Sequence, residues 1–180
     1  GRVFVVLNEK VNGQLQGGEY ALPIPDFPTG TMRGRFHKQN GQLYVCGMFA
    51  WAGNKNGTGG FYRIRYTGET VCLPTTLNAS KNKIRLQFTE KLAPTTAASP
   101  ASFQLQTWDL KRGRNYGSRH YNTKNLEVKG AKLLPDGRTI EVSVPDLKPT
   151  WCMEIKYSLK TATGKSINNT IHNTIHNLIN

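Results

Sequence analysis

The sequence predicts an all-β protein, and three observations lead to that prediction. Short segments in which apolar and polar residues alternate with a period of two recur along the chain, as half-buried strands do. Turn-forming triplets separate several of these segments, at Gln39-Asn40-Gly41, Pro135-Asp136-Gly137 and Thr163-Gly164-Lys165. Signals for helices are nearly missing. Together these features indicate many short strands joined by turns.

Six segments carry the strand pattern most clearly. In chain order they are Arg2–Leu7, Gln42–Phe49, Gly60–Tyr66, Lys83–Phe88, Thr139–Val144 and Trp151–Leu159. The alternation also predicts which side chains enter the core, because every second residue of a strand faces the same side. The expected core side chains are Ile84, Leu86 and Phe88, then Ile140, Val142 and Val144, then Trp151, Met153, Ile155, Tyr157 and Leu159.

Between the strands of the second half lies a segment of low complexity, residues 93–101 (APTTAASPA). We expect a loop or a short helical turn there. A change in composition near residues 68–76 separates a Gly- and Pro-rich first part from more evenly spaced strands. The chain therefore divides at residues 1–72 and 73–180.

The net charge of +13 favours a polyanionic partner, although a basic surface that is simply solvated explains it equally well. No apolar run approaches the roughly 20 residues of a membrane-spanning helix, so no membrane insertion is expected. Cys46, Cys72 and Cys152 form no CxxC motif. Cys46 and Cys152 lie in apolar strand patterns, which predicts buried free thiols there.

The most unusual stretch is Trp108–Lys124 (WDLKRGRNYGSRHYNTK), which interleaves aromatic side chains with five Lys or Arg residues and one acid. One interpretation is a loop that contacts a glycan or another polyanion, since aromatic faces stack on sugar rings while Arg and Lys pair with acidic groups. The other is a long hairpin in which Trp108 and Tyr121 cap the core and the cations are solvated. The candidate ligand-binding residues are Trp108, Arg112, Arg114, Tyr116, Arg119 and Tyr121, together with Trp51.

Other motifs give weaker predictions. His172 and His176 are spaced to share a face, but a metal needs at least one more ligand and no carboxylate lies nearby in the sequence. We therefore expect a hydrogen-bonded terminal segment and no metal. Residues 53–60 (GNKNGTGG) lack the P-loop pattern, which favours a loop between two strands. No catalytic constellation, cofactor motif or nucleic-acid-binding module is recognisable, so no cofactor and no nucleic-acid partner are expected.

Two parts of the chain resemble known classes of domain. The pieces IRLQFTEKLAP, SPASFQL and AKLLPDGRTIEVSVPDLKPTWCMEIKYSLKTATGKSI resemble bacterial immunoglobulin-like domains of exported proteins. The pieces GRVFVVLNE, FPTGTMRGRFH, GQLYVCGMFAWAG and GGFYRIRYTG resemble the closing blade of a sugar-dehydrogenase-like β-propeller. The resemblance implies an immunoglobulin-like β-sandwich over residues 73–180, with a basic aromatic insertion near 108–124. It also implies a propeller-type strand set over residues 1–72.

The whole chain resembles the C-terminal portion of large exported multidomain proteins of planctomycete-type bacteria, with TWDLKRGRNYGSRHY and IHNTIHNL as the most distinctive pieces. This resemblance implies a periplasmic or extracellular location. The function we expect is a non-catalytic interaction module that docks a partner domain or subunit, or binds anionic polysaccharide. The alternative is a fragment or subunit of a sugar-dehydrogenase-like oxidoreductase whose active centre lies mostly outside this chain. A bound chromophore or metal would distinguish the alternative from a binding module.

Overall fold

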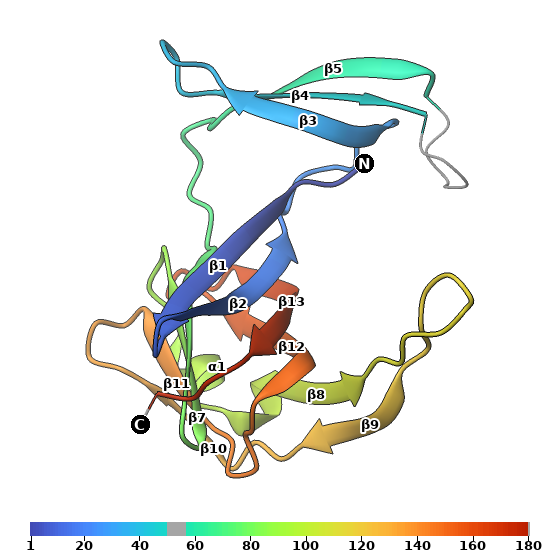
Figure 1. Ribbon diagram of the computed structural model, residues 1–180. Helices are drawn as coiled ribbons and strands as arrows, with labels where there is room; N and C mark the ends of the chain where they lie inside the picture. Colours follow the sequence, from blue (N-terminus) through green and yellow to red (C-terminus); the bar gives the residue numbers. More distant parts are fainter. Residues whose placement is uncertain (50–56, 180) are drawn as a thin grey trace. The chain divides into compact units, whose positions relative to one another are not determined.

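A computed structural model describes residues 1–49 and 57–179 of the chain (Figure 1). The predicted all-β class is confirmed, because the described residues form three antiparallel sheets and only short helical turns. The chain divides into two compact units. The smaller unit comprises Gly1–Val5 and Ala21–Thr70, and the larger comprises Val6–Tyr20 and Val71–Asn180.

The larger unit is a β-sandwich of a six-stranded and a four-stranded sheet. The six-stranded sheet has the order β1 (Phe4–Val11), β2 (Gln14–Ala21), β13 (Ser166–Ile175), β12 (Thr150–Lys160), β8 (Phe103–Asp109) and β9 (Tyr121–Leu126). The four-stranded sheet has the order β10 (Gly130–Leu133), β11 (Thr139–Ser143), β7 (Lys83–Phe88) and β6 (Pro74–Ser80). A short helix α1 (Pro94–Ala97) lies within the predicted low-complexity segment, and a 3-10 turn (Pro100–Ser102) overlaps its end.

The core of the sandwich is made of alternate side chains from both sheets. Ile84, Leu86 and Phe88 of β7 are almost completely buried, as the sequence pattern predicts. On the other sheet Tyr157 meets Phe88 edge to face, with ring centroids 5.5 Å apart. Burying such aromatic and aliphatic side chains contributes most of the stability of a sandwich of this size.

Tight turns join the strands where the sequence supplies residues that tolerate a left-handed backbone. The hairpin of β1 and β2 turns at Asn12 and Gly13, whose φ angles are 51° and 85°, as in a type I′ turn. At the turn before β11, the carboxylate of Asp136 accepts hydrogen bonds from the backbone N–H groups of Arg138 and Thr139 at 3.0 and 2.9 Å. Together with a bond from the Thr139 hydroxyl, these bonds lower the pKa of Asp136.

The β1–β2 hairpin is fastened to the rest of the sandwich by a buried carboxylate. Glu9 accepts hydrogen bonds from Gln16 Nε2 at 2.8 Å, from Asn78 Nδ2 at 2.8 Å and from the backbone N–H of Ala79 at 3.0 Å. Gln16 continues the network, since its Nε2 donates to the carbonyl of Asn177 at 2.8 Å. One charged group thus ties the hairpin to β6, and Gln16 extends that connection to the segment after β13.

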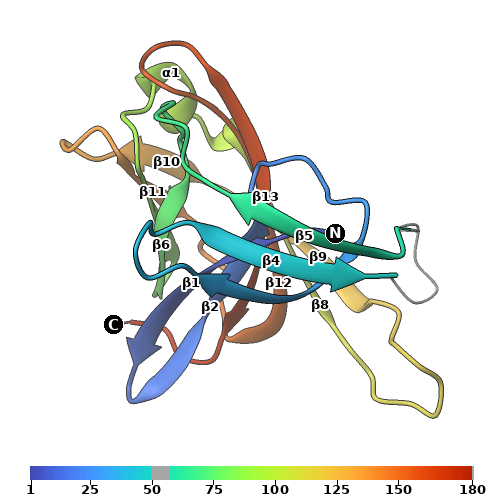
Figure 2. The ribbon, with the colours of Figure 1, turned by 90° about the horizontal axis from the view of Figure 1, so that it is seen from above.

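The smaller unit contains a three-stranded antiparallel sheet of β3 (Gly30–Phe36), β4 (Leu43–Met48) and β5 (Gly59–Ile64), which lie side by side in Figure 2. Val45 is buried on one face of this sheet. Next to it, Tyr62 stacks on Phe27 at 4.4 Å between ring centroids, and its hydroxyl lies 3.1 Å from Thr29 Oγ1.

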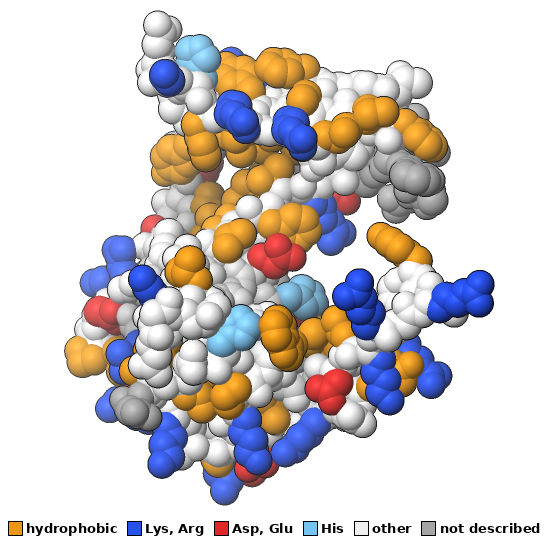
Figure 3. Space-filling view, viewed as in Figure 1, with side chains coloured by type: hydrophobic (Ala, Val, Ile, Leu, Met, Phe, Trp, Pro, Cys, Tyr) orange, Lys and Arg blue, Asp and Glu red, His pale blue; other side chains and the backbone are white. Residues whose placement is uncertain are grey.

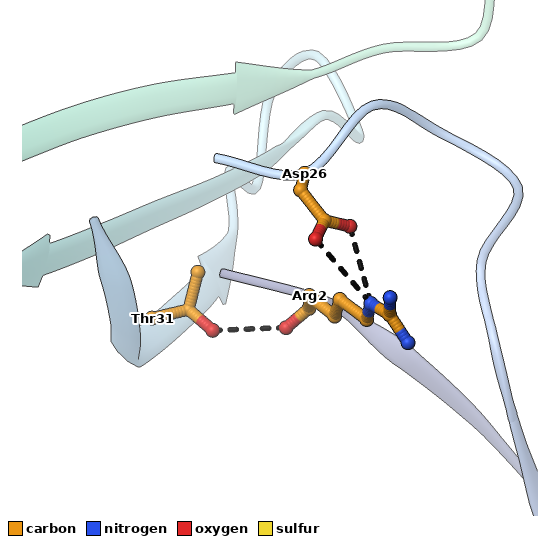
Figure 4. Close-up of polar contacts among 3 residues, drawn as sticks. All are labelled: Arg2, Asp26 and Thr31. Atoms are coloured by element: carbon orange, nitrogen blue, oxygen red, sulfur yellow. Dashed lines mark hydrogen bonds and ion pairs between the residues drawn. The ribbon is translucent and has the colours of Figure 1, made fainter. Parts of the chain in front are cut away.

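The N-terminal residues are attached to this unit by polar contacts. Arg2 forms an ion pair with Asp26 at 3.2 Å, and Thr31 donates to the carbonyl of Arg2 at 2.9 Å (Figure 4). The backbone N–H of Phe27 donates to the carbonyl of Gly1 at 2.8 Å. These contacts hold residues 1–5 beside the segment that leads into β3.

The structure differs from the sequence predictions at the domain boundary, at Cys46 and Cys152, and at Trp151; Cys152, predicted to be buried, is half-buried. The predicted boundary at residues 72 and 73 is close to the observed one between Thr70 and Val71, but the β1–β2 hairpin belongs with the C-terminal unit. The prediction that Cys46 is buried is wrong, because its side chain lies on an exposed face of β4. The prediction that Trp151 faces the core is also wrong: 76% of its surface is exposed. A register shift of β12 between Thr150 and Met153 interrupts the alternation there.

All three cysteines are free; Cys72 is buried and Cys152 is half-buried. Within residues 1–49 and 57–179, no helix is long and apolar enough to cross a membrane.

Candidate functional site

The outer face of the six-stranded sheet presents a row of polar side chains at its centre. Strand register places Gln106 of β8 opposite Glu154 of β12, Glu154 opposite His172 of β13, and His172 opposite Glu19 of β2. Their sequence neighbours point the other way, into the core. The row therefore lies on the side of the sheet that faces away from the four-stranded sheet.

Trp108 lies on the same outer face, because it follows Gln106 by two residues and pairs with Cys152. Its ring stacks on His120, with centroids 4.2 Å apart and planes within 9°. The edge of His172 approaches it at 6.3 Å. These contacts leave only 9% of Trp108 exposed. Trp108 is therefore buried on the outer side of the sheet, where His120 and His172 lie against it.

Trp151 is the exposed aromatic residue of this face. Its carbonyl oxygen accepts a hydrogen bond from Thr174 Oγ1 at 2.7 Å, and its ring meets His176 edge to face at 5.0 Å between centroids. These contacts hold the residue at the sheet surface while most of the ring remains open to solvent.

A shallow hollow of about 680 Å³ extends over the face between the two tryptophans. Gly17 and Gly18 line it, and a Cβ at Gly17 would overlap with the carbonyl oxygen of Leu7. The remaining lining residues are Val6, Leu7, Asn8, Leu15, Gln16, Glu19, Trp108, Trp151, Cys152, Met153, His172, Asn173 and Thr174. Figure 3 shows histidine and hydrophobic side chains gathered on the six-stranded sheet.

The basic stretch predicted from the sequence is the loop that joins β8 to β9, residues 110–120. Its base is ordered by Ser118, whose hydroxyl accepts from the backbone N–H of Lys111 at 3.0 Å and donates to the carbonyl of Arg119 at 2.9 Å. Lys111 Nζ and Arg119 Cζ both lie over the ring of Tyr121, at 4.4 and 4.9 Å from its centroid. Tyr121 thus holds both arms of the loop at its base.

The tip of the loop extends away from the sheet and is fully solvated (Figure 1). Arg112, Arg114 and Tyr116 are exposed there, and Tyr116 has no neighbour that shields its ring. In the part of the chain that the structure describes, none of the four cations of the loop forms an ion pair with a carboxylate. Their charges are therefore available to an acidic partner.

The structure brings six of the seven predicted binding residues into one hairpin. Trp108, Arg112, Arg114, Tyr116, Arg119 and Tyr121 all belong to β8, β9 or the loop between them. Trp51 lies outside the described residues, as do residues 53–56 of the glycine-rich segment.

The two histidines that were considered as metal ligands, and for which no metal was expected, lie against tryptophan rings. His172 meets Trp108 and His176 meets Trp151. Within the described ranges, no group of three or more His, Cys, Asp or Glu side chains is placed to hold a metal ion.

Sequence reasoning missed Trp151 and Glu19 as members of the site. Trp151 was assigned to the core because a strict period of two ignores the register shift that turns it outward. Glu19 was missed because β2 was not predicted. The Asn12-Gly13 pair is a strong hairpin signal and would have pointed to β2.

The acidic groups of this face are few and lie apart. Among the described residues that line the hollow, Glu19 is the one carboxylate. Glu154, the other carboxylate of the row, lies beyond His172 and forms an ion pair with Lys156 Nζ at 2.8 Å. Rings for stacking, histidine and amide groups for hydrogen bonds, and nearby cations are typical of surfaces that hold a polar polymer.

Comparison with family models, with curated proteins and with solved structures finds no match for this chain. The class that the fold defines is an all-β protein with an antiparallel sandwich.

Proposed function

We propose that this chain is a non-catalytic interaction module of an exported bacterial protein, and that its sandwich binds an anionic polysaccharide. The ligand lies along the outer face of the six-stranded sheet and reaches the loop between β8 and β9. The observation that carries the proposal is the exposed ring of Trp151 beside a hairpin whose loop carries four cations that form no ion pair with a described carboxylate.

The hollow supports binding of a sugar chain through its combination of apolar and polar groups. A sugar ring offers an apolar face for stacking and hydroxyl groups around its edge, so it needs an aromatic ring together with donors and acceptors. Trp151 supplies the ring, while His172, Glu19 and Asn8 supply polar atoms within the same hollow.

The loop supports selection of acidic sugars. Trp108 lines the hollow and stacks on His120, the last residue of the loop, so the cationic hairpin begins at the edge of the hollow. Arginine side chains pair with carboxylate and sulfate groups in a planar, two-pronged geometry. A polymer lying in the hollow could therefore bring its acidic groups to Arg112 and Arg114.

The test is a binding titration with polygalacturonate and heparin as acidic polymers and dextran as a neutral one, followed by tryptophan fluorescence. We expect salt-sensitive binding of at least one acidic polymer and weaker binding of dextran. Replacing both Arg112 and Arg114 by alanine removes two exposed charge pairs worth about 0.2–1 kcal/mol each, or about 2- to 30-fold in affinity. Trp151→Ala should weaken binding about 2- to 12-fold through the lost stacking.

The matched control replaces Lys81 and Lys132 by alanine. Both are exposed and belong to the part of the sandwich around the four-stranded sheet, so the net charge changes equally away from the site. This control should bind within about twofold of the wild type. If neither acidic polymer binds at low salt, or if both double variants weaken binding equally, the proposal is wrong.

A further inference from the structure

The smaller unit contains a stretch of sequence that carries no acidic residue. Between Asp26 and Glu69 the chain has no Asp or Glu, but it has six Lys or Arg residues: Arg33, Arg35, Lys38, Lys55, Arg63 and Arg65. Asp26, at the border of the stretch, is engaged by Arg2. The three-stranded sheet formed by this stretch therefore has a positive field that no carboxylate of its own strands offsets.

Strand register places three of these arginines on one face together with two aromatic rings. Arg35 of β3 lies opposite Tyr44 of β4, which lies opposite Arg63 of β5. In the next row on the same face, Arg33 lies opposite Cys46 and Cys46 opposite Phe61. We call this surface, made of Arg33, Arg35, Tyr44, Phe61 and Arg63, the arginine face.

The two rings lie next to each other and are accessible. Tyr44 and Phe61 stack with centroids 5.6 Å apart and an angle of 23° between their planes. Phe61 is 73% exposed, although an isolated phenyl group of a strand usually turns toward a core. His37 adds a third ring, edge to face with Tyr44 at 5.9 Å. A hollow of about 800 Å³ runs along this surface.

The arginine face is not the packed side of its sheet. Val45 and Tyr62 point to the opposite side, where Val45 is buried and Tyr62 stacks on Phe27. Among residues 1–49 and 57–179, Arg33 and Arg35 donate side-chain hydrogen bonds to the carbonyl groups of Met32 and Gly34. Within the described residues, the arginines of the face form no ion pair. Figure 3 shows cationic and hydrophobic side chains side by side on this sheet.

We propose that the arginine face binds single-stranded nucleic acid, with unpaired bases stacked on Phe61 and Tyr44 and backbone phosphates paired with Arg33, Arg35 and Arg63. An open sheet that carries aromatic rings between cations is suited to this ligand, because every base has a face that can stack and every nucleotide carries a phosphate.

The chemistry of the face favours nucleic acid over an acidic polysaccharide. A sugar ring presents many hydroxyl donors and needs side-chain acceptors, as Glu19 and Asn8 provide on the sandwich. The arginine face has no carboxylate and its arginines are donors only. Stacked bases and phosphates need rings and donors, which is what this surface offers.

The test is fluorescence anisotropy of a short fluorescein-labelled oligo(dT) with the whole chain, measured over a range of salt concentrations. With about three phosphates neutralised, log K should fall against log salt with a slope near −2. Phe61→Leu keeps an apolar side chain but removes the ring, and should weaken binding about 5- to 150-fold. Replacing Arg35 and Arg63 by alanine should weaken binding and reduce the steepness of the slope by about 1.4.

The matched control is Phe4→Leu, which removes an exposed phenyl ring from β1 and should leave oligo(dT) binding unchanged. A duplex of the same length should compete poorly, because its base faces are already stacked. The proposal is overturned if the wild type does not bind oligo(dT) at low salt, if Phe61→Leu binds as well as the wild type, or if the duplex competes equally.

The result is independent of the polysaccharide proposal. The Arg112 and Arg114 double variant should retain oligo(dT) binding, and Phe61→Leu should retain binding of the acidic polysaccharide. If the wild type does not bind oligo(dT) and Phe61→Leu loses binding of the acidic polysaccharide, the arginine face is a glycan surface and the nucleic-acid assignment fails.

Discussion

The buried carboxylate of Glu9 offers the sharpest test of how the sandwich is held together. Glu9→Ala removes the acceptor of three hydrogen bonds, from Gln16, Asn78 and the backbone of Ala79. The three donors are not equally affected. Gln16 Nε2 keeps its bond to the carbonyl of Asn177, and the side chain of Asn78 is only half-buried and can turn toward water.

The N–H of Ala79 has no such alternative, since Ala79 is completely buried. Leaving a buried donor unpaired costs about 1–3 kcal/mol, and each of the other two bonds contributes about 1 kcal/mol. We therefore expect Glu9→Ala to lower the free energy of unfolding by about 3–5 kcal/mol, which corresponds to a fall of about 6–20 °C in Tm. Glu9→Gln should cost less, about 1–2 kcal/mol, because one oxygen remains to accept from Ala79.

The assay is urea unfolding followed by far-UV circular dichroism, with Glu127→Ala as the control. Glu127 is exposed after β9 and forms no ion pair with a described residue, so its loss should change the free energy of unfolding by less than about 0.5 kcal/mol. If Glu9→Ala is no more destabilising than Glu127→Ala, or if Glu9→Gln is the worse of the two Glu9 variants, the hydrogen-bond argument is refuted.

Three further outcomes follow from the structure. Hydrogen bonds from Lys83 and Arg85 lower the pKa of Glu141 from 4.5. The ionised carboxylate therefore stabilises the fold above pH 4.5, and this stabilisation is lost as the pH falls through the pKa of the folded state. Glu141→Gln should have a lower urea midpoint than the wild type at pH 7 and the same midpoint in acid. Cys46 is exposed, whereas Cys72 is buried and its pKa is raised by burial. A thiol-specific reagent at neutral pH should therefore label Cys46 first. Cys46→Ser should abolish the fast phase of the labelling reaction. Gly13→Ala should lower the free energy of unfolding by about 1–2 kcal/mol because Gly13 has a φ of 85°, whereas Gly113→Ala should leave it unchanged. Equal shifts in Tm for the two variants would contradict the strain at the turn.

The sequence predicted strands well where one face is uniformly apolar. In β7 every second residue is large and apolar, and the observed strand has the predicted bounds and core side chains. β13 was predicted as a hydrogen-bonded terminal segment but not as a strand, because Asn169 and Asn173 occupy core-facing positions between isoleucines and conceal the period of two. Polar residues at such positions make a strand look like a terminal loop, although tertiary pairing with β12 determines its conformation.

Only the part of the candidate site formed by residues close together in the sequence was predicted. The cations of residues 110–120 are adjacent in sequence, so their clustering was visible without a structure. The hollow was not, because His172 and Glu19 meet through strand pairing between distant segments. Trp108 shows the same limit: its neighbours along the chain do not reveal that His120 and His172 cover it on the outside of the sheet.

The placement of the first hairpin has a consequence for how the chain acquires its structure. Gln16 reaches the backbone of Asn177 across 161 positions of sequence, and β2 pairs with β13, the last strand. A contact between residues so far apart in sequence requires a large loop to close. The entropy cost of closing the loop comes before the contact stabilises the fold, so folding is slow. During synthesis the hairpin therefore emerges long before β13, its partner strand in the sheet. We expect the refolding rate, rather than the final stability, to respond most strongly when the connection between β5 and β6 is lengthened.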